Sequence, residues 1–397
     1  MKSNLVKYIG SNLLIKAFVF LSQLLVAFFI TAEELGLVKT SQAFIEVLSL
    51  FACIGLNASI LATAPKLRML YEREQLYSKV ITQTAINSIL VIASVVIILF
   101  IFASNNASSQ PILFWLLPLV SFTAITTQLV SFLQCEKKFT TLAKGQFIAK
   151  LFSVPILVGL TYGFGLIGYI AALYLASFIT IAIIYNKIGF KLTPNLFSLN
   201  TFKKQWSIAY GAFLSNVLGT CGFYAGLFIT NIVISEPNLI GNYSFALIII
   251  SGFEVISRSI QQYHIPHFAE NPDCNLNILE KKYLRLSIFV ALPVLSMAVL
   301  IATIYPEFKY NDALTPLAIL VLVWCFSFKY TLKSGYFIAT GNTILNFKTS
   351  IVNVSLTVVL SALLGFEFGI IGIAIARLLA SAVLIFTYEK LYENCKY

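Results

Sequence analysis

Long apolar runs divide the sequence, and this division limits the folds open to the chain. Twelve runs of about 16 to 27 mostly apolar residues follow one another, each long enough to cross a bilayer core as a helix. Of the 397 residues, 59% are hydrophobic and 11% are charged, which is more apolar surface than a soluble core of this size could bury. The sequence therefore predicts an all-α integral membrane protein with about 12 transmembrane helices. The runs are Ile9–Ile30, Ser41–Ala64, Val80–Ala103, Pro111–Leu133, Phe147–Tyr162, Leu166–Tyr185, Ile208–Ile234, Leu239–Gln262, Leu286–Tyr305, Leu314–Thr340, Thr349–Leu364 and Gly369–Tyr388.

Basic residues are distributed unevenly between the loops that join these runs. If the N-terminus is cytoplasmic, 19 of the 27 basic residues fall in cytoplasmic segments, whereas the opposite loops hold only Lys39 and Lys309. Positively charged loops stay on the cytoplasmic side of a membrane. The bias therefore predicts two cytoplasmic termini and supports the count of twelve. The net charge of +11 is interpreted as a signal of orientation rather than of nucleic-acid binding.

The two halves of the sequence resemble each other at a fixed offset, which is the first sign of an internal repeat. The segment FGLIGYIAA at 164–172 returns as FGIIGIAIA at 368–376, an offset of 204 residues. An even number of spans per half places both halves in the membrane in the same orientation. We therefore expect two pseudo-symmetric six-helix bundles, residues 1–190 and 207–397, joined by a basic cytoplasmic linker at 191–206. Three further landmarks recur at offsets of 204 or 205 residues: Ser11-Asn12 with Ser215-Asn216, Leu35-Gly36 with Ile240-Gly241, and Phe132 with Phe337.

A few charged residues lie inside the predicted spans or at their edges. Each costs a few kcal/mol or more if it faces lipid, so such residues are expected to face the bundle interior or a water-filled cavity. The only clearly intramembrane carboxylates in the prediction are Glu46 and Glu254. The basic residues are Lys16, Lys150, Arg258, Lys329, Lys333 and Arg377.

Helical spacing groups these charges with polar neighbours. Lys16 shares a face of the first helix with Asn12 and Gln23, and two further stripes lie on equivalent helices of the two halves. These stripes are Gln42, Glu46, Ser49, Cys53 and Asn57 in the first half, and Ser251, Glu254, Arg258 and Gln262 in the second.

The charged pairs allow more than one interpretation. Glu254 and Arg258 are four residues apart and could simply neutralise each other, as could Glu46 and a nearby Lys16. Arg377 could form an interhelical bond or face a cavity. Lys329 and Lys333 share a face with Tyr336 and have no acid in their own helix, so we expect this lysine pair to face an anionic substrate.

Other chemical signals are weak. The six cysteines show no CxxC spacing, and His264 and His267 form no metal motif, so we expect no metal site and no cofactor. The sequence contains no P-loop, HExxH, GxSxG or dinucleotide fingerprint, which argues against a built-in ATPase or hydrolase.

The chain resembles the flippases of the multidrug/oligosaccharidyl-lipid/polysaccharide (MOP) exporter superfamily, and among them the Wzx-type O-antigen flippases of Gram-negative bacteria. The resemblance covers nearly the whole length, and its patterns are loose. It rests on Ser11-Asn12 in the first helix, Leu35-Gly36 before the second, Ala64-Pro65 closing it, and the FGLIG segment at 164–168. It implies a MATE-like fold.

The resemblance also implies a function: translocation of an undecaprenyl-diphosphate-linked oligosaccharide from the cytoplasmic to the periplasmic leaflet of the inner membrane by alternating access. Its implied partners are the lipid-linked oligosaccharide, membrane lipid, and the O-antigen polymerase and chain-length regulator. Fixed cations suit a diphosphate, whereas aromatic and amide groups suit sugars. We therefore expect Lys16, Arg258, Lys329 and Lys333 at the diphosphate, and Gln42, Asn57, Gln262 and Tyr336 at the sugars. Glu46, Glu254 and Arg377 would be charged residues of the cavity. Either Glu46 or Glu254 would bind a coupling proton or sodium ion.

Two alternatives stay open at this stage. A cation-coupled multidrug efflux transporter would share the fold. Many members of the drug-efflux branch of this superfamily have a carboxylate in the first helix, whereas this sequence has Lys16 there. A polyprenol-linked glycan polymerase would be similarly apolar. Such an enzyme is expected to have a large external loop with acid and base residues, whereas the longest external loops here are about ten residues long.

Overall fold

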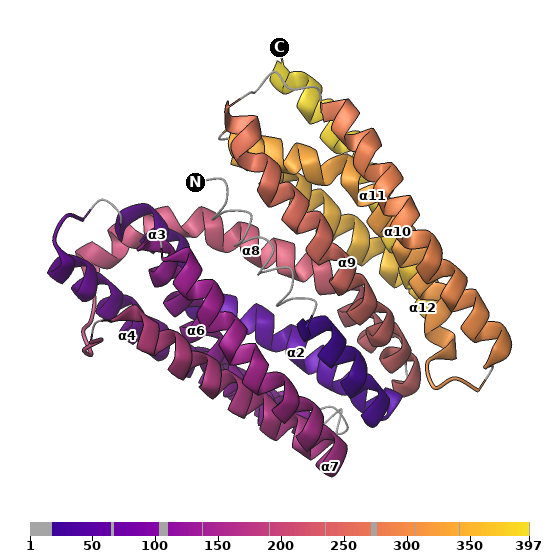
Figure 1. The fold of residues 1–397 in the computed structure, drawn as a ribbon, viewed down its shortest axis with the longest axis horizontal. Helices are drawn as coiled ribbons and strands as arrows, with labels where there is room; N and C mark the ends of the chain where they lie inside the picture. The colour runs from indigo at the N-terminus through magenta and orange to yellow at the C-terminus, as the bar shows by residue number, and fades with distance from the viewer. Residues whose placement is uncertain are drawn as a thin grey trace. The chain divides into compact units, whose positions relative to one another are not determined.

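The structure, a computed structural model, describes residues 18–64, 67–102, 110–136, 138–189, 191–234, 236–270, 276–305, 307–340 and 342–396 (Figure 1). Within these ranges the chain is almost entirely helical and contains no β-strand. The helices in chain order are Phe18–Phe29, α2 (Ala32–Cys53), α3 (Leu56–Thr63), α4 (Leu70–Phe102), α5 (Gln110–Leu116), α6 (Leu119–Cys135), α7 (Phe139–Ile188), α8 (Leu199–Val233), α9 (Pro237–Glu270), α10 (Leu276–Ile304), the 3₁₀ turn η2 (Asn311–Ala313), α11 (Leu314–Ala339) and α12 (Thr343–Lys396).

Nine helices of the described ranges are long and apolar enough to cross a membrane. Two of them, α7 with 50 residues and α12 with 54, are long enough for two crossings each. The multi-pass membrane architecture predicted from the sequence is thereby confirmed. The count of twelve spans stays a prediction.

Each of the two longest helices reverses direction at a glycine. Gly165 in α7 has φ 56° and ψ −134°, and Gly369 in α12 has φ 58° and ψ −139°. A positive φ with this ψ is open to glycine and strongly disfavoured for residues with a Cβ. The two glycines are 204 residues apart, so the repeated FGxIG sequence forms the same reversal twice.

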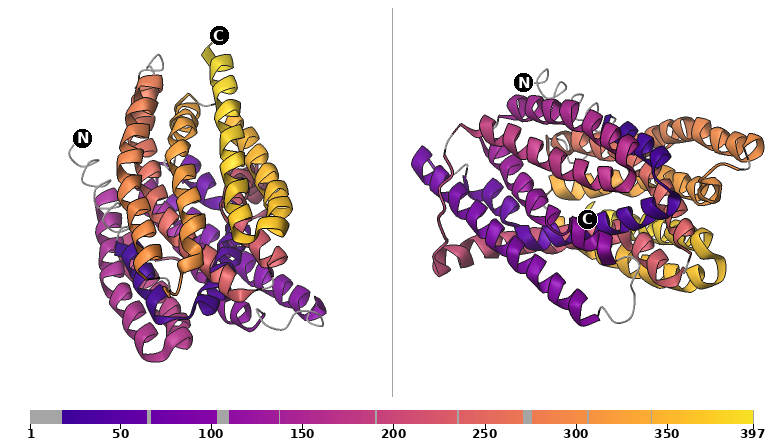
Figure 2. Two further views of the ribbon diagram at one scale, coloured as in Figure 1. Left: turned by 90° about the vertical axis from the view of Figure 1, so that its right-hand side faces the viewer. Right: turned by 90° about the horizontal axis from the view of Figure 1, so that it is seen from below.

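Contacts between distant residues show that the segments on either side of each reversal run antiparallel. In α7, Lys138 Nζ donates to the Ile188 carbonyl at 3.3 Å. In α12, Thr349 Oγ1 donates to the Tyr388 hydroxyl at 2.8 Å. Figure 2 shows the two segments of α12 lying side by side. Both long helices are therefore hairpins, which agrees with the paired runs predicted on either side of each glycine.

The reversals also require glycine three residues further on. A Cβ at Gly168 would collide with the carbonyl of Leu160, and one at Gly372 would collide with the carbonyl of Leu364. The second glycine of the repeated motif thus lets the returning segment pass directly over the backbone of the outgoing one.

Two predicted single spans are interrupted in the structure. The run at 41–64 divides into α2 and α3 because Ile54 (φ 45°) and Gly55 (φ 68°) adopt left-handed conformations. The run at 111–133 divides into α5 and α6 at Pro118, which lacks the N–H that would continue a helix. Each of these runs is thus built from two consecutive helices, and residues Ile112–Cys135 together are still long and apolar enough to cross a membrane.

The described residues form two compact units. Unit 1 contains residues of 1–30 and 41–220, and unit 2 contains 31–40 and 221–397. These units divide the chain differently from the predicted bundles at 1–190 and 207–397 and the linker at 191–206, which stay a prediction based on the repeat.

Each unit is organised around one central helix. In unit 1, α6 packs against α3, α4 and α7; in unit 2, α11 packs against α9, α10 and α12. Phe132 in α6 and Phe337 in α11 are both fully buried in these contacts. They are 205 residues apart, so helices that are equivalent in the sequence repeat hold equivalent central places.

Within unit 2, the start of α2 crosses α9 at a point where two backbones touch. A Cβ on Gly36 would lie 2.7 Å from the backbone nitrogen of Gly241, and a Cβ on Gly241 would collide with the carbonyl of Ala32. Gly36 and Gly241 are matched by the sequence repeat. The close approach therefore joins two equivalent positions and needs glycine at both.

We predict that Gly165→Ala and Gly369→Ala each destabilise the protein by about 1–3 kcal/mol, because alanine would be held at a positive φ. Thermal unfolding of the purified protein in detergent measures this effect. Gly163→Ala is the matched control, since it lies in the helical part of α7 and a Cβ there meets nothing within 4 Å. Equal melting temperatures for all three variants would contradict the role assigned to the reversals.

Candidate functional site

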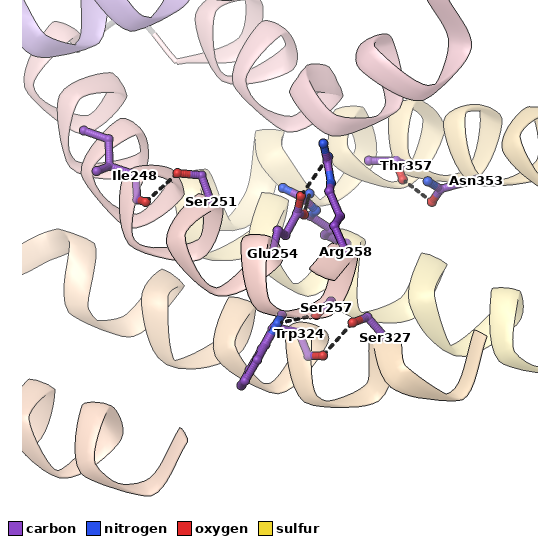
Figure 3. Close-up of polar contacts among 10 residues, drawn as sticks. Ile248, Ser251, Glu254, Ser257, Arg258, Trp324, Ser327, Asn353 and Thr357 are labelled. Atoms are coloured by element: carbon purple, nitrogen blue, oxygen red, sulfur yellow. Dashed lines mark hydrogen bonds and ion pairs between the residues drawn. The ribbon is translucent and has the colours of Figure 1, made fainter. Parts of the chain in front are cut away.

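A carboxylate in unit 2 binds two arginines from different segments of the chain, and Figure 3 shows its pairing with Arg258. Glu254 of α9 accepts from Arg258 Nη2 at 3.2 Å, one helical turn away. Its other oxygen lies 3.6 Å from Arg377 Nη2, in the returning segment of α12. One carboxylate between two guanidinium groups leaves the cluster with a net positive charge.

The two arginines differ in how firmly they are held. The Arg377 side chain is 15% exposed, its guanidinium lies 5.2 Å from the centre of the Phe223 ring, and it interacts electrostatically with the buried Tyr243. The Arg258 side chain is 63% exposed and has Glu254 as its ion-pair partner. Arg377 is thus a fixed charge, whereas Arg258 is an accessible one.

Two neutral hydrogen bonds lie in the same unit. Trp324 Nε1 of α11 donates to Ser257 Oγ of α9 at 2.7 Å, which fixes the packing of these helices beside Glu254. In the first segment of α12, Thr357 Oγ1 donates to Asn353 Oδ1 at 3.4 Å. The sequence analysis did not select Asn353 and Thr357. Their spacing of four residues in an apolar run was the available signal.

Lys333, predicted to face an anionic substrate, is fully buried and bound by two carboxylates. Its Nζ lies 3.0 Å from Glu280 of α10 and 3.1 Å from Glu389 of α12, and it also donates to the Lys329 carbonyl at 3.3 Å. The same lysine therefore ties three helices of unit 2 together. The sequence analysis missed both acids because they lie in other helices.

The remaining predicted residues of unit 2 are placed as follows. Lys329 is half-buried and lies near enough to Glu280 to interact with it electrostatically. Tyr336 is 6% exposed, with its ring packed against Phe268 and Tyr392 in the core. The side chain of Gln262 lies outside the described part of the structure.

Unit 1 contains the other predicted residues. Gln42 Nε2 donates to the Tyr169 hydroxyl at 3.0 Å, while Glu46, one turn further along α2, is exposed. Asn57 is half-buried and directly follows the helix break at Ile54 and Gly55. Lys16 lies outside the described residues. The structure thus joins Glu254 to Arg258 and Arg377, and the predicted roles of all eleven site residues stay proposals.

The described residues contain no group of three or more His, Cys, Asp or Glu side chains arranged to hold a metal ion. Five of the cysteines belong to the described ranges, and all five are free thiols.

The fold is similar to those of solved MOP superfamily proteins. An inward-facing multidrug resistance MATE family transporter of the MOP superfamily matches with a TM-score of 0.70 and 15% identity over 95% of each chain. The lipid II flippase MurJ, in an inward closed conformation, matches with a TM-score of 0.75 and 16% identity over 96% of this chain and 86% of that one. The MATE transporter VcmN from Vibrio cholerae matches with a TM-score of 0.68 and 14% identity over 99% and 96% of the two chains. These likenesses confirm the predicted MATE-like all-α membrane fold.

The family follows from the sequence. The model for the family described as polysaccharide biosynthesis protein matches residues 2–272, more than half of the chain. The chain belongs to this family, within the MOP superfamily. No curated relative matched the sequence.

We predict that Lys333→Met destabilises the protein by about 3–5 kcal/mol, because it leaves Glu280, whose side chain is 10% exposed, without its cation in a poorly solvated place and also removes the partner of the half-exposed Glu389. Thermal unfolding in detergent measures the loss. The triple variant Lys333→Met, Glu280→Gln, Glu389→Gln also removes the two unpaired carboxylates and should regain most of the lost stability. If the single variant melts like the wild type, Lys333 does not hold these helices together.

Proposed function

We propose that the protein is a flippase that moves an undecaprenyl-diphosphate-linked oligosaccharide, such as an O-antigen repeat unit, from the cytoplasmic to the periplasmic leaflet of the inner membrane. The observation that carries the proposal is the net positive cluster of Glu254, Arg258 and Arg377 in a chain of the polysaccharide biosynthesis family. Support for a lipid-linked substrate comes from the similarity of the fold to that of MurJ, which is a lipid II flippase.

Arg258 is the residue best suited to meet a diphosphate. Its guanidinium is accessible, and a planar fork of N–H donors matches two oxygens of a phosphate group. When a diphosphate arrives, Arg258 exchanges the Glu254 carboxylate for phosphate oxygens, and Glu254 keeps its contact with Arg377. The ion pair therefore holds Arg258 in place before substrate binds, so that less side-chain freedom is lost on binding.

The other proposed contacts are those that the sequence predicts. Gln42, Asn57 and Gln262 supply amide groups for sugar hydroxyls, and Lys16 and Lys329 supply further positive charge near the diphosphate. Lys333 and Tyr336 are buried in the described conformation, so their part in binding would require a conformation in which α11 is more open. Glu46 and Glu254 are the candidates for binding a coupling ion.

The cellular setting is part of the same proposal. Both termini lie in the cytoplasm, the two lobes alternate access to the leaflets, and the polymerase and chain-length regulator of the same pathway act on the flipped units. The strongest competing function is efflux of cationic drugs, a use of the same fold. A cluster with net positive charge would repel a cation, which favours the anionic substrate.

The proposal is tested by deleting the gene and following surface polysaccharide and the sidedness of lipid-linked repeat units. We expect surface glycan to be lost while complete units accumulate on the cytoplasmic face. Normal glycan with increased sensitivity to cationic drugs would instead establish efflux. Units that are flipped but not polymerised would point to a polymerase.

The role of Arg258 is tested by complementing this deletion. Loss of a charge-assisted bidentate contact costs about 1.5–3 kcal/mol, so Arg258→Ala should lower export about 10-fold to 100-fold. Arg258→Lys keeps the positive charge but lacks the paired N–H donors of the guanidinium group, so it should give an intermediate rate of export. Arg68→Ala is the control, because it removes an exposed positive charge elsewhere. Wild-type export by Arg258→Ala at equal abundance would remove Arg258 from the site.

A further inference from the structure

Four lysines gather at one end of the α7 hairpin in unit 1. The reversal at Gly165 brings the start of the hairpin, with Lys138 and Lys144, back to its end, with Lys187. Lys138 Nζ donates to the Ile188 carbonyl, and a Cβ on the neighbouring Gly145 would lie 3.8 Å from Cγ of Lys187. Lys191 follows immediately after the hairpin. We call Lys138, Lys144, Lys187 and Lys191 the α7 lysine patch.

The α7 lysine patch is exposed and is not neutralised by the described part of the chain. All four side chains are exposed, and no ion pair joins any of them to a described carboxylate. The neighbouring acid in the sequence, Glu136, is already bound by Arg73 at 3.2 Å and by the Tyr77 hydroxyl at 2.9 Å. Like charges held close together repel, so a surface of this kind is stabilised by an external anion.

The equivalent end of the other hairpin is different. There Lys348, the counterpart of Lys144 at an offset of 204, and Lys390 are exposed, but the same end of α12 also carries Glu389 and Glu393. Glu389 already binds Lys333 at 3.1 Å, and Glu393 is exposed. The α7 segment itself, Phe139–Ile188, contains lysines and no acid, so the concentration of positive charge belongs to α7 and not to the repeated hairpin as such.

The α7 lysine patch borders an apolar surface. Phe147, Leu151 and Phe152 lie one to two turns from Lys144 and are 44%, 48% and 57% exposed. Large exposed apolar side chains on a membrane helix face lipid chains, and lysines at the helix end reach the level of the headgroups. A molecule that fits both features has acyl chains and an anionic phosphate headgroup.

We propose that the α7 lysine patch is a binding site for the phosphate groups of anionic phospholipids in the surrounding leaflet. The lysines contact the phosphate oxygens, and the acyl chains lie along Phe147, Leu151 and Phe152. A basic residue near an anionic membrane surface contributes about 1 kcal/mol, which corresponds to about a 5-fold change in affinity per lysine. This site is independent of the proposed flippase activity and lies in a different unit from the Glu254 cluster.

Native mass spectrometry of the full-length protein tests the proposal, with phosphatidylglycerol or phosphatidylcholine titrated into a neutral detergent. We expect the wild type to retain phosphatidylglycerol in preference to phosphatidylcholine. The double variant Lys144→Gln, Lys187→Gln should lose about 25-fold in phosphatidylglycerol affinity, the product of two 5-fold losses. Phosphatidylcholine binding should not change.

The control is the double variant Lys348→Gln, Lys390→Gln, which removes the same charge from the end of α12. We expect it to bind phosphatidylglycerol nearly as well as the wild type. Equal losses in both double variants would show a general effect of net charge and overturn the site, as would an unchanged affinity in the α7 variant. Because these side chains are exposed, all variants should melt like the wild type, and Lys144→Arg, Lys187→Arg should retain binding.

Discussion

Charge is costly in the poorly solvated interior of a membrane protein, and the packing of the described helices depends on how that cost is offset. Lys333 has carboxylates from two other helices, Glu254 has two guanidinium groups, and Glu136 has Arg73 and Tyr77. Each arrangement joins helices that are distant in the sequence. The ionic clusters are therefore also the points that fix which helices pack together.

The two central helices show how differently equivalent places can be filled. Gln128 in α6 and Lys333 in α11 occupy positions 205 residues apart, and both are fully buried. Gln128 is neutral and donates to Thr84 Oγ1 at 3.2 Å, whereas Lys333 requires two carboxylates. Unit 1 thus keeps a neutral polar centre and unit 2 a charged one, and the accessible Arg258 belongs to the charged unit.

Local patterns in the sequence predicted local structure well. The FGxIG repeat predicted equivalent landmarks, and the structure shows the same backbone reversal at Gly165 and Gly369, because a glycine-specific conformation is encoded by adjacent residues. The i, i+4 spacing likewise predicted the pairing of Glu254 with Arg258 as one of two interpretations. Partners from other helices could not be predicted. Spacing shows which residues share a face of one helix, but Arg377 and Glu280 reach their partners only through helix packing.

The contact between Gly36 and Gly241 has a consequence for the origin of the chain. In a duplicated protein, these two glycines descend from a single position of a shorter ancestor. If two copies of that ancestor paired as a symmetric dimer, the glycine of each copy would touch its own counterpart across the two-fold axis, as residues on the axis of an isologous interface do. A single substitution there would have placed two side chains in the contact at once. If the copies were then fused into one chain, the two positions became separate in the gene, so that each helix could afterwards change without its twin.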